Sequence, residues 1–322
     1  MKDRPPGVRD DDLVAALADG WGLTARAVAY RPVGFGSHHW TAEVADPGRG
    51  GSTRQLFVTV DVLSGERPAA LARLTAALDT ALALRRDAGL EFVVAPVPDR
   101  TGATVRLLGE RHTVAVFPLV DGVAGDFGRH RREDVPAVLD LLVRLHGAAV
   151  AKAPRGDLVL PGRNDLEAAL LDVGRPWSGG PFAEPARALL TRRTDLLRTM
   201  LGAFDRLAEE VREASGTWVV THGEPHPGNV IRGATGLCLI DWDTVRLAPP
   251  ERDLWMLDGD AELLARYTRE TGHPVSPTAL ALYRLWWDLA DIAVYVAELR
   301  GPHEAGEDTT AAWTYLQGHL AG

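Results

Sequence analysis

The sequence contains a single cysteine, Cys238, and therefore no pair of thiols for a disulfide. Cys238 lies in a predicted buried strand, where we expect a packed thiol rather than a nucleophile. Lysine is almost as rare, because Lys2 and Lys152 are the only lysines in the chain. These shortages exclude a disulfide framework and a cysteine metal cluster, and they leave arginine to supply nearly all of the positive charge.

Targeting and membrane segments are also missing. Residues 1–12 are charged and contain proline, unlike a signal peptide, and no later apolar run is long enough to cross a bilayer. The formal net charge of −9 argues against a nucleic-acid partner and is compatible with a cationic substrate. We therefore expect a soluble cytoplasmic protein that binds neither nucleic acid nor membrane.

Several common catalytic motifs are absent. The sequence has no G-x-x-x-x-G-K-[ST] phosphate loop, no G-x-S-x-G nucleophile elbow and no H-E-x-x-H zinc helix. With 322 residues, of which 46% are hydrophobic, the chain can still bury a sizeable core. Its length suggests two domains or lobes.

The most informative stretch runs from residue 218 to residue 243. An apolar strand (218–220) leads into the polar loop T-H-G-E-P-H-P-G-N-V, a short strand ending at Ile231, a glycine-rich turn and a second strand (237–240) followed by D-W-D. Such a hairpin would bring Glu224, Asn229 and Asp241 together. One carboxylate can orient or deprotonate an acceptor hydroxyl, while the amide and the other carboxylate can hold Mg²⁺ through hard oxygens. The pattern therefore indicates phosphoryl transfer from a magnesium nucleotide.

Protein kinases carry a comparable order of residues, H-R-D-x-x-x-x-N followed by D-F-G. The loop resembles that of the aminoglycoside phosphotransferase family, which usually reads H-G-D-x-H-x-x-N followed by I-D-W-D or I-D-F-D. The resemblance is close over this loop and loose over the whole chain, and Glu224 stands where the family has its catalytic Asp. It implies a two-lobed kinase fold, ATP or GTP with Mg²⁺, and a hydroxylated small molecule as acceptor.

The first 118 residues would form the N-terminal nucleotide-binding lobe. Helices are predicted over 10–18 and 67–87, and strands over 26–33, 39–45, 55–62, 91–96, 104–108 and 112–117, with a flexible connection marked by glycine and proline between 46 and 51. Gly34, Gly36 and Ser37 lie between the first two strands, where a kinase-like lobe carries the glycine loop whose amides cover the phosphates. An ordinary hairpin turn is the alternative.

The third predicted strand lacks a residue that kinases use. Thr59 stands where they carry the lysine that contacts the α- and β-phosphates, and neither lysine of the chain lies in a strand of this lobe. The helix that follows offers no obvious glutamate partner. Arg54, Arg67 and Arg73 are candidate substitutes, although each is more simply explained as a solvated surface residue.

The lobe junction is predicted at 117–122, where proline and glycine interrupt an apolar strand. In the family this segment supplies backbone groups to the nucleobase, so Phe117 and Leu119 are candidate nucleotide contacts; an edge strand running into a loop is the alternative. Residues 119–322 would form the C-terminal catalytic and substrate-binding lobe. The predicted fold class is α+β, with a small, mainly antiparallel β N-lobe and a larger, mainly helical C-lobe.

The C-lobe helices are predicted over 135–149, 184–214, 260–271, 278–300 and 310–320, with a short helix before the second. The helix over 278–300 mixes aromatic and acidic residues, which suits a cationic ring substrate. The family builds part of its acceptor pocket in this region, so Asp288 and Asp291 are candidate substrate contacts. The simpler alternative is a core-packed stripe with one solvated acidic side.

Three functions remain open from the sequence. We expect a phosphotransferase that moves the γ-phosphoryl group of a nucleoside triphosphate to a small-molecule hydroxyl, on an aminoglycoside, aminocyclitol or related antibiotic, and so confers resistance. A metabolic sugar or amino-alcohol kinase is the second interpretation. A degenerate kinase-like fold that binds ligand without turnover is the third, suggested by Thr59 and Glu224. The retention of Asn229 and Asp241 argues against it.

Overall fold

The computed structural model describes residues 1–45, 52–63, 65–214, 216–234, 236–257 and 260–321. The chain divides into two compact units, the first formed by Met1–Arg155 with Trp218–His273 and the second by Gly156–Thr217 with Pro274–Gly322. The flexible connection predicted at 46–51 lies outside the described residues. The predicted lobe boundary after residue 118 falls within the first unit and stays a prediction.

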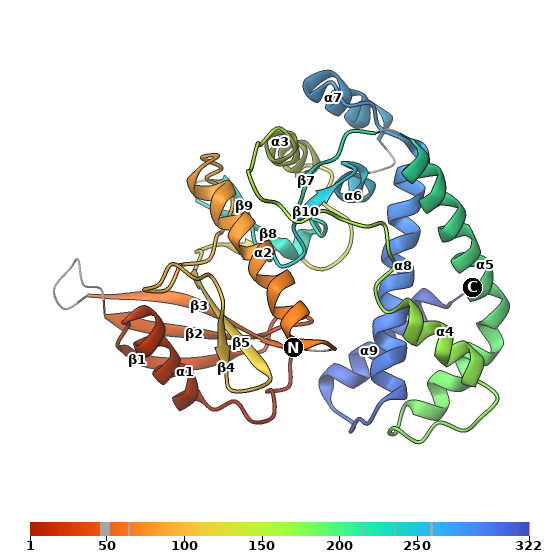
Figure 1. Cartoon of the computed structure of the whole chain (residues 1–322), viewed down its shortest axis with the longest axis horizontal. Coiled ribbons are helices and arrows are strands. Elements are labelled where there is room, and N and C mark those ends of the chain that lie inside the picture. Colours follow the sequence, from red (N-terminus) through yellow and green to blue (C-terminus); the bar gives the residue numbers. More distant parts are fainter. Residues whose placement is uncertain (46–51, 64, 215, 235, 258–259, 322) are drawn as a thin grey trace. The chain divides into compact units, whose positions relative to one another are not determined.

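The first unit contains a five-stranded antiparallel sheet in the order β1-β2-β3-β5-β4 (Figure 1). Its strands are β1 (Ala25–Arg31), β2 (His38–Ala45), β3 (Thr53–Val62), β4 (Arg106–Leu108) and β5 (His112–Pro118). Because side chains alternate along a strand, one face of the sheet forms a core around Trp40 and Val58. Helix α1 (Asp10–Ala16) and the π-helical turn after it contribute Leu13 and Leu17 to this core. The other face is left for the residues between these core positions, including Thr59.

The strand predicted over 91–96 is wrong. Between α2 (Arg67–Arg86) and β4, only an isolated bridge joins Val93 to Leu239. The Val94 amide donates to the Leu239 carbonyl (3.0 Å), and the Leu239 amide donates to the Phe92 carbonyl (2.8 Å). The three apolar side chains from Phe92 to Val94 are buried. Their apolar character therefore reflects packing beside β9 rather than a place in the five-stranded sheet.

The remainder of the first unit surrounds the polar loop. Its strands are β6 (Val123–Ala124), β7 (Val219–Thr221), β8 (Val230–Gly233), β9 (Gly236–Leu239) and β10 (Arg246–Ala248), and its helices are α3 (Val135–His146), α6 (Glu251–Leu254) and α7 (Ala261–Thr271). Strands β6, β8 and β9 form one small sheet, and β7 pairs with β10. The short strand expected to end at Ile231 begins at Val230 instead, because Pro227–Asn229 forms a 3-10 turn.

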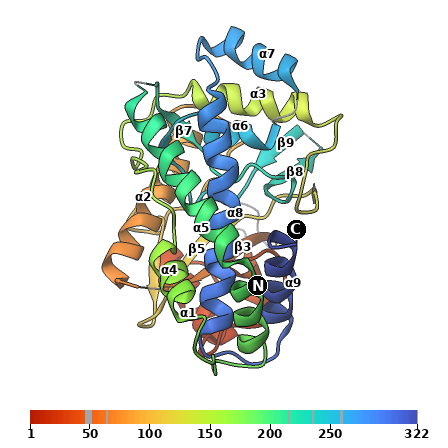
Figure 2. The ribbon, with the colours of Figure 1, turned by 90° about the vertical axis from the view of Figure 1, so that its right-hand side faces the viewer.

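The described residues of the second unit form helices and no strand: α4 (Arg163–Asp172), α5 (Ala183–Glu213), α8 (Pro277–Arg300) and α9 (Glu307–His319). Helix α8 packs against the other three, and Figure 2 shows α5 crossing α8. Ser276 caps α8 by accepting a hydrogen bond from the Ala279 amide, and Pro277 occupies the first turn, where its missing N–H costs nothing. No helix within the described ranges is both long and apolar enough to span a membrane.

Candidate active site

A buried histidine holds the polar loop after β7. The His222 Nε2 lies 2.8 Å from the Ile240 carbonyl, and its Nδ1 accepts a hydrogen bond from the Glu224 amide (3.2 Å). Since a carbonyl can only accept, this arrangement requires the tautomer with the proton on Nε2. Burial lowers the pKa of His222 to about 4, so the ring is neutral near pH 7. His222 thus ties the loop to the residue that precedes Asp241.

A buried carboxylate supports the same loop from α6. Asp253 accepts hydrogen bonds from the amides of His222 (2.8 Å) and Gly223 (2.6 Å). Its Oδ2 also lies 3.1 Å from His146 Nε2, and His146 Nδ1 lies 2.8 Å from the Tyr267 hydroxyl. Burial opposes ionisation, but the hydrogen bond from His146 and nearby positive charge outweigh it and hold the pKa of Asp253 below its ordinary value. Asp253 is therefore a structural anchor of the loop.

Gly223 could not be replaced by a residue with a side chain without disturbing this anchor. Its φ of +104° lies in the left-handed region, and an added Cβ would lie 2.2 Å from the Arg252 guanidinium. Arg252 is buried and donates through Nη1 to the Thr221 hydroxyl (3.0 Å). The glycine lets the loop pass close to this buried cation.

Glu224, Asn229 and Asp241 are brought together, as the sequence predicts. The Asn229 side-chain amide donates to the Glu224 carbonyl (3.0 Å), and the Ile240 amide donates to the Asn229 carbonyl (3.0 Å). Asn229 is buried in the 3-10 turn. With Nδ2 engaged by the loop, Oδ1 is the side-chain atom suited to a hard cation.

Asp241 occupies a strained and electrostatically crowded position. Its φ is +65°, which is uncommon for a residue other than glycine. Removal of water by the surrounding protein raises the pKa of Asp241 well above its usual range, and the negative charges of Asp243, Glu224 and Asp61 raise it further. Burial likewise raises the pKa of Asp243, against the lowering influence of nearby arginines. Asp241 and Asp243 are nevertheless exposed, so a ligand can reach both carboxylates.

This donor set fits a magnesium ion bound together with a nucleotide. Within the described residues, no three His, Cys, Asp or Glu side chains form a group that could hold a metal. Mg²⁺ is usually held by one or two carboxylates together with water and substrate phosphates rather than by a complete protein cage. Asn229 and Asp241 can supply such a partial set, and a bound cation would relieve the repulsion between Asp241 and the carboxylates that raise its pKa.

The predicted glycine loop joins β1 to β2. Gly34 and Gly36 have φ values of +71° and +90°, which glycine adopts without strain. The Met1 amino group donates to the carbonyls of Gly34 (3.0 Å) and Ser37 (2.9 Å). The Ser37 hydroxyl donates to the Asp61 carboxylate at the end of β3. The loop is therefore held at several points, and its contact with phosphate stays a prediction.

Thr59 lies on the sheet face opposite the N-terminal core, paired with His39 of β2 and Ala115 of β5. Strand alternation places Phe57 and Asp61 on the same face as Thr59. The Phe57 ring stacks on His39 with centroids 5.0 Å apart. This face thus presents a stacked aromatic pair and a carboxylate where a kinase would present a lysine.

The arginines considered as lysine substitutes are all exposed. Arg54 lies near the start of β3, Arg73 lies on α2, and Arg67 donates to the Glu110 carbonyl (2.9 Å). Asp79, the acidic residue inside α2, accepts a hydrogen bond from Thr104 (2.7 Å). Neither of these hydrogen bonds involves Thr59, and the substitution of an arginine for the lysine stays a prediction.

The candidate nucleobase contacts lie at the end of β5. Phe117 is buried and pairs with Phe57, while Leu119 follows the strand and donates its amide to the Gln55 carbonyl over 3.4 Å. A base that used the Leu119 amide would have to compete with this long hydrogen bond. Their role in nucleotide binding stays a prediction.

The two candidate substrate residues belong to the second unit. Asp288 and Asp291 on α8 both face His319 of α9, with N–O distances of 3.4 Å and 3.2 Å. Hydrogen bonds to these carboxylates raise the pKa of His319 to about 9. The acidic pair is therefore already matched by an internal cation at neutral pH, and its contact with substrate stays a prediction.

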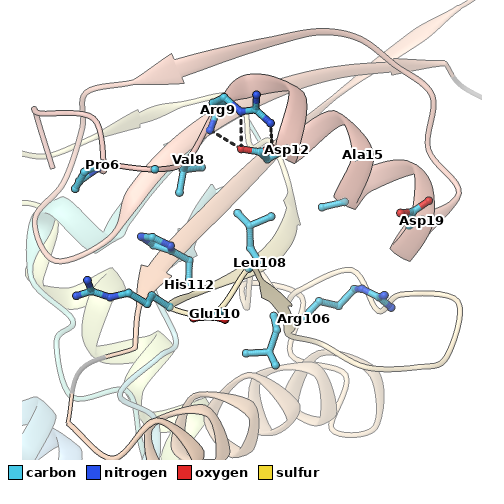
Figure 3. Close-up of a pocket in the computed structure, with 15 residues that line it drawn as sticks. Pro6, Val8, Arg9, Asp12, Ala15, Asp19, Arg106, Leu108, Glu110 and His112 are labelled. Carbon is cyan, nitrogen blue, oxygen red and sulfur yellow. Dashed lines mark hydrogen bonds and ion pairs between the residues drawn. The ribbon is translucent and has the colours of Figure 1, made fainter.

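A cavity of about 730 Å³ lies elsewhere in the first unit. Figure 3 shows it between the segment around Val8, helix α1 and the β4–β5 hairpin, with Leu108 and Arg106 on one side and an Arg9–Asp12 ion pair on the other. None of the predicted site residues lines it. This cavity therefore does not coincide with the predicted catalytic residues.

Sequence reasoning missed three contributors to the site. Asp243 was present in the I-D-W-D segment, and strand alternation could have placed Asp61 beside Thr59. The role of His222 depends on a hydrogen bond to Ile240, eighteen residues away, that no local pattern reveals.

Comparison with known proteins identifies the family. The model of the "Phosphotransferase enzyme family" matches residues 44–295, which is most of the chain. The chain belongs to this family. This phosphotransferase is 30% identical over 250 residues to Protein StrN of Streptomyces griseus, covering 74% of each protein.

Solved structures show the same fold. Spectinomycin phosphotransferase APH(9)-Ia, in complex with ADP and spectinomycin, superposes with a TM-score of 0.73 at 16% identity, covering 97% of this phosphotransferase and 94% of that chain. Choline kinase LicA from Streptococcus pneumoniae gives 0.58 at 14% identity, covering 97% and 98%. The microcompartment-associated aminopropanol kinase gives 0.58 at 19% identity, covering 97% and 96%. The predicted α+β, two-lobed kinase-like fold is thereby confirmed.

Proposed function

We propose that this phosphotransferase moves the γ-phosphoryl group of ATP or GTP to a hydroxyl of a small molecule. The acceptor is an aminoglycoside, an aminocyclitol or a related antibiotic, and the result is resistance by O-phosphorylation in the cytoplasm. The observation that carries the proposal is the convergence of Glu224, Asn229 and Asp241 on one hairpin whose backbone is anchored by buried groups. Similarity to a spectinomycin phosphotransferase supports this acceptor class.

Glu224 would orient the acceptor hydroxyl and take its proton. Its backbone is held on both sides, by His222 at the amide and by Asn229 at the carbonyl. Such positioning matters because an error of about 1 Å can cost on the order of 100-fold in rate. A glutamate in place of the family's aspartate reaches farther by about one C–C bond of ~1.5 Å, so the acceptor would be bound correspondingly farther from the loop.

Asn229 and Asp241 would hold the magnesium ion. When bound, Mg²⁺ supplies positive charge that offsets the charge on the transferred phosphoryl group. The hairpin contributes the fixed geometry of the ligands, because Asn229 is anchored to the Glu224 carbonyl and Asp241 directly follows a residue bonded to His222.

The test is turnover by the purified protein with ATP or GTP, Mg²⁺ and a panel of hydroxylated acceptors, with the mass of each product measured. Spectinomycin and several aminoglycosides form the antibiotic arm, and choline, aminopropanol and simple sugars form the metabolic arm. We expect a product heavier by one phosphoryl group in the antibiotic arm. Nucleotide binding without transfer to any acceptor would instead support the degenerate fold.

An amino-alcohol kinase is the second candidate. Its support is the similarity in fold to choline kinase and aminopropanol kinase, whose names describe small amino alcohols. A higher kcat/KM for choline or aminopropanol than for any antibiotic would favour this candidate. Either outcome keeps the same roles for Glu224, Asn229 and Asp241.

A further inference from the structure

The Asp61 carboxylate lies beside the glycine loop. None of the sequence motifs gives Asp61 a role. Ser37, the last residue of the loop, precedes His38, which pairs with Val60 of β3. This register sets Ser37 beside Asp61, and the Ser37 hydroxyl donates to the Asp61 carboxylate. The loop is thus fastened to the strand that in other kinases carries the phosphate-binding lysine.

The charge of Asp61 has the wrong sign for a substitute lysine. Asp61 lies on the same face as Thr59, and its negative charge contributes to the raised pKa of Asp241. Burial raises the pKa of Asp61 itself to about 6, with Ser37 acting against this and Asp243 adding to it. The Asp61 carboxylate cannot bind a triphosphate directly. The group that it holds is the Ser37 hydroxyl of the glycine loop.

We propose that Asp61 is a positioning residue that acts through Ser37 to order the glycine loop over the phosphates of the nucleotide. The proposal rests on the proposed function. A hydrogen bond to a carboxylate is stronger than one between neutral groups. A loop ordered before binding loses less conformational entropy when the nucleotide arrives. The site would thereby recover, through loop order, part of the nucleotide affinity that a lysine supplies through charge.

The experiment compares five variants in full-length protein: Asp61→Ala, Asp61→Asn, Ser37→Ala, Ser37→Thr, and the double variant of the two alanine changes. Asp61→Ala should raise the nucleotide KM about tenfold, the worth of one hydrogen bond to a charged group, and leave the acceptor KM unchanged. Asp61→Asn keeps an acceptor oxygen but loses the charge, so its nucleotide KM should lie between those of wild type and Asp61→Ala. Ser37→Thr keeps the hydroxyl and should stay within about threefold of wild type.

The double variant separates loop positioning from independent contacts of the two residues. If Asp61 acts through Ser37, both alanine changes break the same hydrogen bond. The nucleotide KM of the double variant should then not exceed the higher of the two single-variant values. If the two effects multiply instead, Ser37 and Asp61 act independently and the proposal is overturned.

Asp79 provides a matched control, because its carboxylate accepts a hydrogen bond from the Thr104 hydroxyl in the same unit (2.7 Å). Asp79→Ala breaks an acid–hydroxyl pair that is not part of the glycine loop. It should change thermal stability at most and leave the nucleotide KM at the wild-type value. An equal rise in nucleotide KM for Asp79→Ala and Asp61→Ala would reduce Asp61 to a general structural role and overturn the proposal.

Failure of the proposed function can be told apart from failure of this inference. Titration with a fluorescent ATP analogue in the presence of Mg²⁺ ranks the same variants without any acceptor. If the wild type transfers nothing but the ranking holds, only the proposed function fails. If Asp61→Ala is folded and its nucleotide affinity matches wild type, the inference fails. If the wild type binds neither ATP nor GTP, both are overturned.

Discussion

Two groups of carboxylates in this phosphotransferase differ in how their charge is balanced. In the hairpin of the first unit, burial by the surrounding protein and three other carboxylates raise the pKa of Asp241. On α8 of the second unit, Asp288 and Asp291 share His319, whose pKa is raised to about 9 by them. The carboxylates of the first group repel one another, which a bound cation would relieve, and the second group already has its cation. This difference separates carboxylates suited to recruit a metal from carboxylates that stabilise helix packing.

The most direct test of the difference between the two carboxylate groups is a substitution at Asp241. Asp241→Asn removes the charge that should hold Mg²⁺, and we expect kcat to fall by at least about 1,000-fold, since removal of electrostatic stabilisation from a transferred group is this costly. The fold should persist, because the substitution relieves repulsion. Steady-state kinetics and circular dichroism measure the two effects. Activity that survives removal of divalent metal with EDTA would show that this hairpin does not work through a metal.

Glu224 tests whether charge or position governs the same hairpin. Glu224→Gln abolishes basicity and should lower kcat by about 100- to 1,000-fold, within the usual range of general-base catalysis. Glu224→Asp keeps the charge but withdraws it by about one C–C bond of ~1.5 Å, so a smaller loss, on the order of 100-fold or less, is expected. Reference pKa values of the two acids differ by only about 0.4. Near wild-type turnover by the Gln variant would remove Glu224 from the mechanism.

Thr59 tests whether a missing cation can simply be restored. Thr59→Lys places an ammonium on the same strand face as Asp61, about 6.6 Å along the strand. The new cation would be drawn to that carboxylate rather than to a phosphate and would compete with Ser37 for it, so activity should not rise and nucleotide KM should not fall. Kinetics of this variant and of Arg54→Ala, Arg67→Ala and Arg73→Ala provide the measurement. A silent wild type with turnover appearing only in Thr59→Lys would favour the degenerate fold, whereas loss of activity in one arginine variant would identify the substitute.

The smallest effect is expected in the second unit. The folded-state pKa of His319, about 9, lies above the ordinary histidine value of 6.5. Its ion pairs therefore add stability that is complete below pH 6.5 and lost as the pH rises through 9. His319→Gln should lower Tm by a few degrees at about pH 6 and hardly at all at about pH 10. The same Tm difference at both values would show that packing, rather than charge, explains the role of His319.

Substitutions of the α8 carboxylates test whether they also contact the acceptor. Asp288→Asn and Asp291→Asn should raise the acceptor KM alone if these carboxylates also bind a cationic substrate. Unchanged acceptor kinetics with a lowered Tm would assign the pair entirely to helix packing.

The sequence predicts most helices and strands to within a few residues because their apolar periodicity is long and regular. It fails over 91–96, where an apolar run is buried beside β9 without joining the five-stranded sheet. Glu224, Asn229 and Asp241 could be placed together because a single hairpin connects them. The ion pair of Asp288 with His319 could not be predicted, since it depends on the packing of α9 on α8 and not on any local spacing.

The anchoring of two loop amides by Asp253 has a consequence for the dynamics of the chain. The N–H groups of His222 and Gly223 donate to a buried, ionised carboxylate. Breaking either hydrogen bond would leave that buried charge short of a donor. Amide hydrogen exchange at these two positions should therefore be as slow as in the strands of the core, although they lie in a loop. The segment nearest to the reacting groups would then unfold only with the protein itself, and adjustment to differently shaped acceptors must come from other segments.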